Sequence, residues 1–151
     1  MTDEVITNEE WKRCKDGALM LSLLEKVSGP PGSDGRRPLV LAACECARLA
    51  LPHIQKGESR PLFAIETAER WAHGGKVTLE QMQTAADAAT HAAYDASYNA
   101  AHAAACAAAP NDTAYAATYA ARADDAPERV LCECADIVRK HFPEPPVKAG
   151  K

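Results

Sequence analysis

Large apolar side chains are scarce in this 151-residue sequence. Valine, isoleucine, leucine and phenylalanine together account for only 24 residues, and aromatic residues make up 5% of the chain. So small a share of large apolar residues is common in disordered chains. Two features argue against disorder here: the net charge is a modest −4, and 32 residues are alanine, the strongest helix former. The sequence therefore predicts an alanine-rich helical protein with few large core residues.

Long apolar runs and an excess of basic residues are also missing. No run approaches the roughly 18 uninterrupted apolar residues that a membrane span needs. With 17 Lys and Arg against 21 Asp and Glu, the chain is not expected to bind the phosphate backbone of a nucleic acid. Its first residues are acidic, unlike a secretory leader. We therefore expect a cytoplasmic protein with neither a membrane nor a nucleic acid as its partner.

Strand patterns and common catalytic motifs are absent as well. No alternating five-residue run rich in Val, Ile, Thr or aromatic residues occurs. The sequence lacks a phosphate-binding glycine loop, a Gly-x-Ser-x-Gly elbow, a His-Glu-x-x-His motif and a dinucleotide fingerprint. We expect an all-α, multi-helix bundle, and the missing motifs weigh against an enzyme without excluding one.

Capping residues mark several helix starts. Thr7 with Glu10 and Thr78 with Gln81 have the spacing of a capping box, in which each side chain satisfies a backbone N–H of the first turn. Ser59 is expected to be the N-cap of another helix, which has a proline in its first turn. The helices that the sequence predicts cover residues 7–17, 18–27, 38–52, 59–74, 79–109, 113–123 and 125–142.

These helices are expected to form one domain over residues 1–142. A loop of glycine, proline, serine and aspartate interrupts it at residues 28–35. Residues 143–151 hold three prolines and two lysines and are expected to be an extended tail.

The segment from residue 79 to residue 109 contains no helix breaker before Pro110. It predicts a single helix about 46 Å long at the α-helical rise. Because alanine side chains are short, such a helix gains dispersion contacts only when its neighbours approach closely. We therefore expect it at the centre of the bundle, with the large side chains supplied by the helices around it.

The tripeptide Cys-Glu-Cys occurs twice, at residues 44–46 and 132–134, and each copy is followed by a histidine at the same distance. The shared offset of 88 residues suggests a duplication, although one pair of short segments is thin support. The six cysteines are expected to be free thiols in a reducing compartment. They are Cys14, Cys44, Cys46, Cys106, Cys132 and Cys134.

A zinc site is one alternative for these cysteines and histidines. Residues two apart on a helix point in directions about 200° apart, so one Cys-x-Cys unit cannot chelate an ion. A tetrahedral site would need Cys46 and His53 together with Cys134 and His141. Pro52 should end the helix before His53, and cysteine is common inside packed helices. Structural thiols are therefore favoured, and no metal or cofactor is expected.

Two rows of polar and aromatic side chains follow the predicted long helix. An aspartate beside a histidine fixes the tautomer of the imidazole and raises its pKa, which suits a general base. The same spacing also describes an ordinary solvated helix face. The rows are Asp87, His91 and Asp95, and Tyr94, Tyr98 and His102.

Several short segments of the chain match the pattern of a known family. They are Glu10-Trp11, Cys14, Leu41 to Pro52, Arg60-Pro61, Ala64-Ile65-Glu66, Ala68, Trp71-Ala72, Gly74 and Ala135 to Arg139. In these segments the chain resembles a bacterial family of immunity-protein-like, alanine-rich helical proteins, and also uncharacterised planctomycete-type proteins. The resemblance covers residues 9–75 and 130–142, and the chain departs from the family in its loop at 28–35. It implies an all-α cytoplasmic protein that binds and neutralises a toxin, and it brings no catalytic residues.

Taken together, the sequence predicts a non-enzymatic domain that covers the active site of a protein partner with an acidic helix face. We expect an exposed aromatic pair, Tyr94 with Tyr98 or Tyr115 with Tyr119, on one face. The alternatives are a ligand-binding or hydrolytic pocket on the long helix and the Cys/His metal bundle. Trp71 could anchor a core or an interface. The candidate binding residues are His91, Tyr94, Asp95, Tyr98, His102 and Trp71.

Overall fold

The computed structural model describes residues 6–146, and eight α-helices make up most of this part of the chain. No strand occurs between residues 6 and 146, which confirms the all-α, multi-helix bundle. Residues 1–5 and 147–151, parts of the predicted domain and tail, lie outside the described residues. The helices are α1 (Asn8–Arg13), α2 (Gly17–Glu25), α3 (Arg37–Arg48), α4 (Arg60–Ala72), α5 (Leu79–Asp95), α6 (Tyr98–Ala108), α7 (Ala116–Arg122) and α8 (Pro127–His141).

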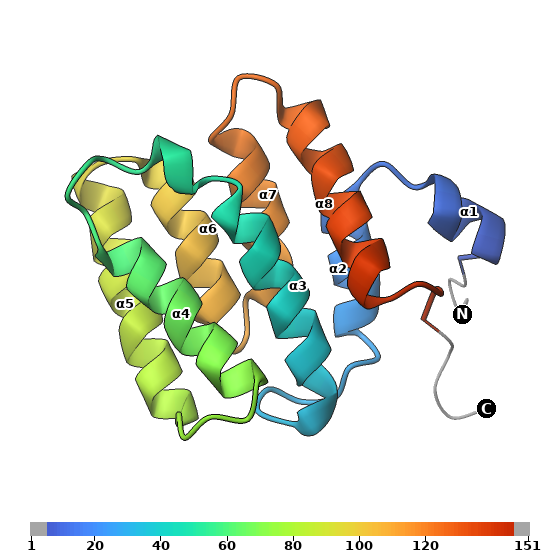
Figure 1. Ribbon diagram of the computed structural model, residues 1–151, viewed down its shortest axis with the longest axis horizontal. Coiled ribbons are helices and arrows are strands. Elements are labelled where there is room, and N and C mark those ends of the chain that lie inside the picture. Colours follow the sequence, from blue (N-terminus) through green and yellow to red (C-terminus); the bar gives the residue numbers. More distant parts are fainter. Residues whose placement is uncertain (1–5, 147–151) are drawn as a thin grey trace.

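Helix α6 occupies the middle of the bundle. It packs against α3, α4, α5 and α7, and eight of its eleven residues are buried, seven of them alanines. Figure 1 shows α4, α3 and α8 side by side, with α5 at one edge of the bundle and α1 at the other. The expectation that alanine-rich sequence lies at the centre therefore holds for α6.

The single helix predicted for residues 79–109 is wrong. The chain leaves the helical conformation at Ala96 and Ser97 and forms two helices, α5 and α6. Ala96 is extended, with φ −173° and ψ 161°, and Ser97 is left-handed, with φ 58° and ψ 47°. The two helices then pack along each other as a hairpin, the most extensive helix contact in the described part of the chain (Figure 1).

Burial of alanine faces explains the break. A rod of about 46 Å would project beyond neighbours of 7 to 15 residues and leave its alanines in water. Folding back lets α5 and α6 cover each other, and this gain outweighs the roughly 1 to 2 kcal/mol that a left-handed non-glycine residue costs. Ser97 also gains a contact, because its Oγ accepts a hydrogen bond from the Gln55 N–H at 3.0 Å.

The other helices supply the large apolar side chains of the core, as expected. Trp11 ties α1 to the end of α8, because its Nε1–H donates to the Phe142 carbonyl at 2.9 Å. Arg139 of α8 in turn donates to the carbonyl oxygens of Trp11 and Cys14, at 2.9 and 2.8 Å. The largest fully buried apolar side chains include Trp11, Met20, Leu21, Leu39, Ile65, Met82 and Val138.

Most of the predicted helix ends are confirmed. Both capping boxes are present: Thr7 Oγ1 accepts from the Glu10 N–H and Thr78 Oγ1 from the Gln81 N–H, each at 3.0 Å. Ser59, however, makes no side-chain capping bond. The first helix also ends earlier than predicted, at Arg13, because the carboxylate at residue 16 caps α2 separately.

The chain beyond α8 is non-helical at residues 143–146, in keeping with the predicted tail. Within residues 6–146, none of the helices combines the length and the apolar composition that a membrane crossing requires.

Gly17, the first residue of α2, permits the closest approach between α2 and α8. A Cβ atom at this position would lie 2.3 Å from the Cβ of Cys134 and 2.6 Å from its carbonyl carbon. The second of these is a backbone atom, so the clash cannot be relieved by turning a side chain. Only glycine fits between the two helices at their present spacing.

We predict that Gly17→Ala destabilises the fold by about 3 kcal/mol, the upper end of the usual cost of overpacking, because the added methyl group meets backbone atoms and α2 must move away from α8. Chemical denaturation followed by circular dichroism measures this loss. Gly57→Ala is the control, since it adds a methyl group in open space and carries only the cost of its positive φ, about 1 to 2 kcal/mol. Equal stabilities for the two variants would contradict the close contact at Gly17.

Candidate functional site: an aromatic row on α5, α6 and α7

Four ring side chains form a continuous row across three helices. The ring centroids of Tyr94 and Tyr98 lie 6.1 Å apart, with the ring planes inclined at 52°. Tyr98 stacks on His102 at 5.2 Å, and His102 meets Tyr119 edge-on at 4.4 Å. The guanidinium of Arg122 lies over the Tyr119 ring, 5.1 Å from its centroid. We call Tyr94, Tyr98, His102 and Tyr119 the aromatic row.

The turn between α5 and α6 sets the geometry of the row. Tyr94 lies in the last turn of α5, Tyr98 is the first residue of α6, and His102 follows Tyr98 by one helical turn. Tyr119 comes from α7, which packs along α6. Sequence reasoning grouped the first three rings but did not join Tyr119 to them, because that contact depends on how α6 and α7 pack.

Exposure decreases along the aromatic row. Tyr94 and Tyr98 are 72% and 46% exposed, whereas His102 and Tyr119 are half-buried. Tyr94 and Tyr98 therefore form an exposed aromatic pair on one face, as the sequence predicted. Exposed rings held in contact with one another are a common mark of an interaction surface.

His102 is held as a neutral imidazole within the row. Its Nδ1 is buried and has no hydrogen-bond partner among the described residues. Burial lowers the pKa of His102, and the negative charge of Asp112 opposes this only in part. A neutral ring between Tyr98 and Tyr119 acts as a rigid stacking element, which keeps the exposed end of the row in place.

Basic side chains are scarce in the segment that carries the aromatic row. Residues 79–122, which contain α5, α6 and α7, carry four acidic side chains and a single basic one, Arg122. This segment therefore accounts for three of the four excess negative charges of the whole chain. The rest of the chain has a net charge of only −1. The four acidic residues are Glu80, Asp87, Asp95 and Asp112.

The predicted pairing of His91 with aspartate carboxylates is not formed. Nδ1 of His91 lies 2.9 Å from the backbone carbonyl oxygen of Asp87, not from its carboxylate. The carboxylate of Asp95 instead accepts from Arg60 of α4 at 2.9 Å. The two histidine–aspartate pairs that would suit a general base are thus absent from the described contacts.

Tyr98 of the aromatic row also borders a hollow of about 320 Å³ at the end of the bundle. This hollow is lined as well by His53, Asn99 and Arg122.

The last candidate residue, Trp71, does not join the aromatic row. Trp71 is only 6% exposed and is covered by the Arg37 guanidinium, 4.5 Å from its ring centroid. Trp71 therefore belongs to the core and lies apart from the aromatic row.

The two Cys-Glu-Cys segments, distant in sequence, pack together where α3 meets α8. Cys46 and Cys134 are fully buried, and the contact with the Cys134 thiol, together with burial, raises the pKa of Cys46 well above its usual value. Burial likewise raises the pKa of Cys44, and it raises that of Cys106 to about 12. The thiols of Cys44, Cys46 and Cys106 therefore stay protonated at neutral pH, which suits packing and not nucleophilic chemistry.

Polar contacts at one end of this interface tie α3 to α8. Burial alone would raise the pKa of Glu45, but hydrogen bonds from Lys140 and His141 of α8 outweigh it and lower the pKa. His141 Nε2 lies 2.9 Å from Glu45 Oε1. Glu45 is therefore an ionised bridge between the two helices.

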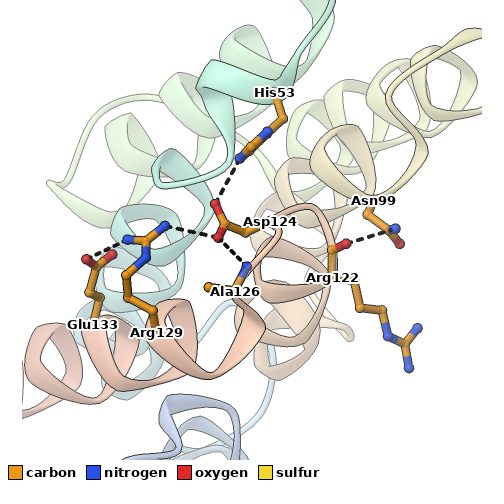
Figure 2. Close-up of polar contacts among 7 residues, drawn as sticks. All are labelled: His53, Asn99, Arg122, Asp124, Ala126, Arg129 and Glu133. Atoms are coloured by element: carbon orange, nitrogen blue, oxygen red, sulfur yellow. Dashed lines mark hydrogen bonds and ion pairs between the residues drawn. The ribbon is translucent and has the colours of Figure 1, made fainter.

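A second network closes the other end of the interface, as Figure 2 shows. His53 Nε2 lies 3.2 Å from Asp124 Oδ1, and Arg129 donates to both Asp124 and Glu133, at 3.0 and 2.9 Å. The Ala126 N–H donates to Asp124 at 2.8 Å. Asp124 thus fixes the turn between α7 and α8 and binds it to the segment that follows α3.

The four residues of the hypothetical zinc site take part in different contacts and do not come together. Cys46 and Cys134 pack in the interior, His53 pairs with Asp124, and His141 pairs with Glu45. Within residues 6–146, no group of three or more histidine, cysteine or acidic side chains is arranged to hold a metal ion. The repeated cysteine and histidine spacing that suggested a metal site is better explained by the packing of two similar helices against each other.

Comparison of the chain with protein-family models, with curated proteins and with solved structures finds no match. The fold and the site alone thus define the class: an alanine-rich α-helical bundle with an exposed aromatic row.

We predict that Asp124→Asn lowers the melting temperature at pH 7, and that the difference from wild type shrinks below about pH 4. The pKa of Asp124 is lowered by the Ala126 N–H, His53 and Arg129 against the opposing effect of burial. A carboxylate with a lowered pKa contributes stability that is present above its unfolded pKa and is lost as the pH falls through its folded pKa.

Thermal unfolding followed by circular dichroism from pH 7 to pH 2 checks this. Asp125→Asn is the matched control, because Asp125 is exposed and is expected to leave the melting temperature unchanged. A difference that stays constant across this pH range would show that the Asp124 charge does not hold the turn.

Proposed function

We propose that the chain is a non-enzymatic helical domain that binds a partner protein through the aromatic row. The observation that carries this proposal is the exposed contact between Tyr94 and Tyr98, held in place from behind by His102 and Tyr119. Tyrosine is among the residues that contribute most binding energy at protein interfaces. Rings already held in position lose little conformational entropy on binding.

The partner we propose carries a basic surface. The excess negative charge of residues 79–122 would attract such a surface and disfavour acidic partners. Binding of such a partner would not require the aromatic row to rearrange, because the row lies on helices that form part of the packed core.

We further propose that the partner is a toxin of the cytoplasm, which the domain neutralises by covering its active site. This more specific proposal is supported by the resemblance of residues 9–75 and 130–142 to immunity-protein-like sequences. The net negative charge of residues 79–122 adds to it, since an acidic surface can occlude a basic active-site cleft.

A photo-cross-linking experiment tests the proposal. Placing p-benzoylphenylalanine at residue 115, which is exposed one turn before Tyr119, would leave the aromatic row intact. Cross-linking in the cells that make the protein is expected to trap one partner, which mass spectrometry identifies. The affinity of that purified partner is then measured by calorimetry.

We predict that the double variant Tyr94→Ala/Tyr98→Ala binds this partner at least tenfold more weakly, which corresponds to about 1.4 kcal/mol or more. Phe63→Ala is the control: Phe63 is also exposed, at 53%, but lies on α4 outside the row, and its loss should change the affinity less than twofold. A double variant that binds as tightly as wild type would overturn the proposal.

A further inference from the structure

The aromatic row is closed by a cation at one end and open at the other. Its buried end finishes at Tyr119, whose ring carries the Arg122 guanidinium. Each inner ring touches two neighbours, whereas Tyr94 at the open end touches Tyr98 and is otherwise 72% exposed. The free face of Tyr94 is therefore the place where the row can be extended by a binding partner.

Two other rings of the chain, one buried and one half-buried, show which charged group its aromatic side chains accept. Both cation–π pairs of the described residues use arginine, Arg122 on Tyr119 and Arg37 on Trp71, at 5.1 and 4.5 Å. A guanidinium is planar and weakly hydrated, so it stacks on a ring at less cost than an ammonium group does.

The charges near Tyr94 favour a cation as well. Asp95 follows Tyr94 in the sequence as the last residue of α5, and its side chain is 69% exposed. Arg60 contacts Oδ2 of that carboxylate, and Oδ1 makes no hydrogen bond with the described residues. Arg60 is itself neutralised by Glu58 at 2.6 Å, so Glu58, Arg60 and Asp95 together leave one negative charge. Asp87, two turns before Tyr94, adds another.

We propose that the open end of the aromatic row, Tyr94 with Tyr98, binds an arginine side chain of the partner protein, with Asp95 as its counter-ion. This inference rests on the proposed function and names the chemistry of the contact. The guanidinium stacks on the Tyr94 ring as Arg122 does on Tyr119, and Oδ1 of Asp95 accepts one of its N–H groups. An acidic group at this place would meet the charge of Asp95 and be repelled.

A pair of small probes tests the contact without the partner. N-acetyl-arginine amide carries the guanidinium, and N-acetyl-citrulline amide is nearly the same shape but uncharged. Each is titrated into the full chain with ¹³C-labelled tyrosine and phenylalanine rings, and the ring signals are followed by NMR. The arginine probe should shift Tyr94 and Tyr98 in a saturable way, with at least fivefold weaker effects from the citrulline probe.

Phe63 is the internal control, since it borders a hollow in which two basic side chains, Arg70 and Lys76, face a single acidic one, Glu80, so that a cation should not be attracted. Tyr94→Phe keeps the ring and is expected to bind the arginine probe within twofold of wild type. Tyr94→Leu removes the π face, and Asp95→Asn removes the charge. Each of these two should weaken binding at least threefold, while the amide spectrum reports that the fold is intact.

Equal shifts from both probes, or no shift of Tyr94 and Tyr98 with either, would overturn the arginine contact. The outcome is separable from that of the proposed function. If Tyr94→Ala/Tyr98→Ala abolishes partner binding while the arginine probe has no effect, the row binds a partner by another contact. If the probe binds as expected while the double variant keeps full affinity for the partner, the arginine site stands and the proposed function fails.

Discussion

Close approach between alanine faces is the constraint on which this bundle depends. With 24 large aliphatic and phenylalanine side chains in 151 residues, the chain cannot fill a wide core, so its helices must come near enough for methyl groups to touch. Helix α6 meets this condition most fully, because four helices surround its buried alanines. Gly17 allows the same close approach where α2 packs on α8, at a spacing that leaves no room for even one methyl group.

The same constraint creates the candidate site. Alanines on α5 and α6 are buried only if the chain reverses at Ser97, and this reversal sets Tyr94 and Tyr98 on either side of the turn. Packing of α7 on α6 then brings Tyr119 against His102 and completes the row. The rings are left outside because the close alanine contacts have no room for them. The candidate site and the core are thus two results of one pattern of small and large residues.

The fold was predictable wherever a local signal fixes the backbone. The capping boxes at Thr7 and Thr78 bond as their spacing indicated, and the absence of strands follows from the missing alternation. The break at Ser97 was not predictable from propensity, since neither Ala96 nor Ser97 stops a helix by itself and the advantage of the hairpin is tertiary. For the same reason the tyrosine pair was found from spacing, whereas Tyr119 and the pairing of the two Cys-Glu-Cys helices required the structure.

The reversal at Ser97 can be tested directly by a distance measurement between the two ends of the α5–α6 segment. Nitroxides attached through p-acetylphenylalanine at positions 80 and 111, both exposed, avoid the six cysteines of the chain. Double electron–electron resonance should give a separation below about 25 Å, since packed helices lie about 8 to 10 Å apart. A separation near 46 Å, the length of an unbroken helix at about 1.5 Å per residue, would contradict the hairpin and the aromatic row that it positions.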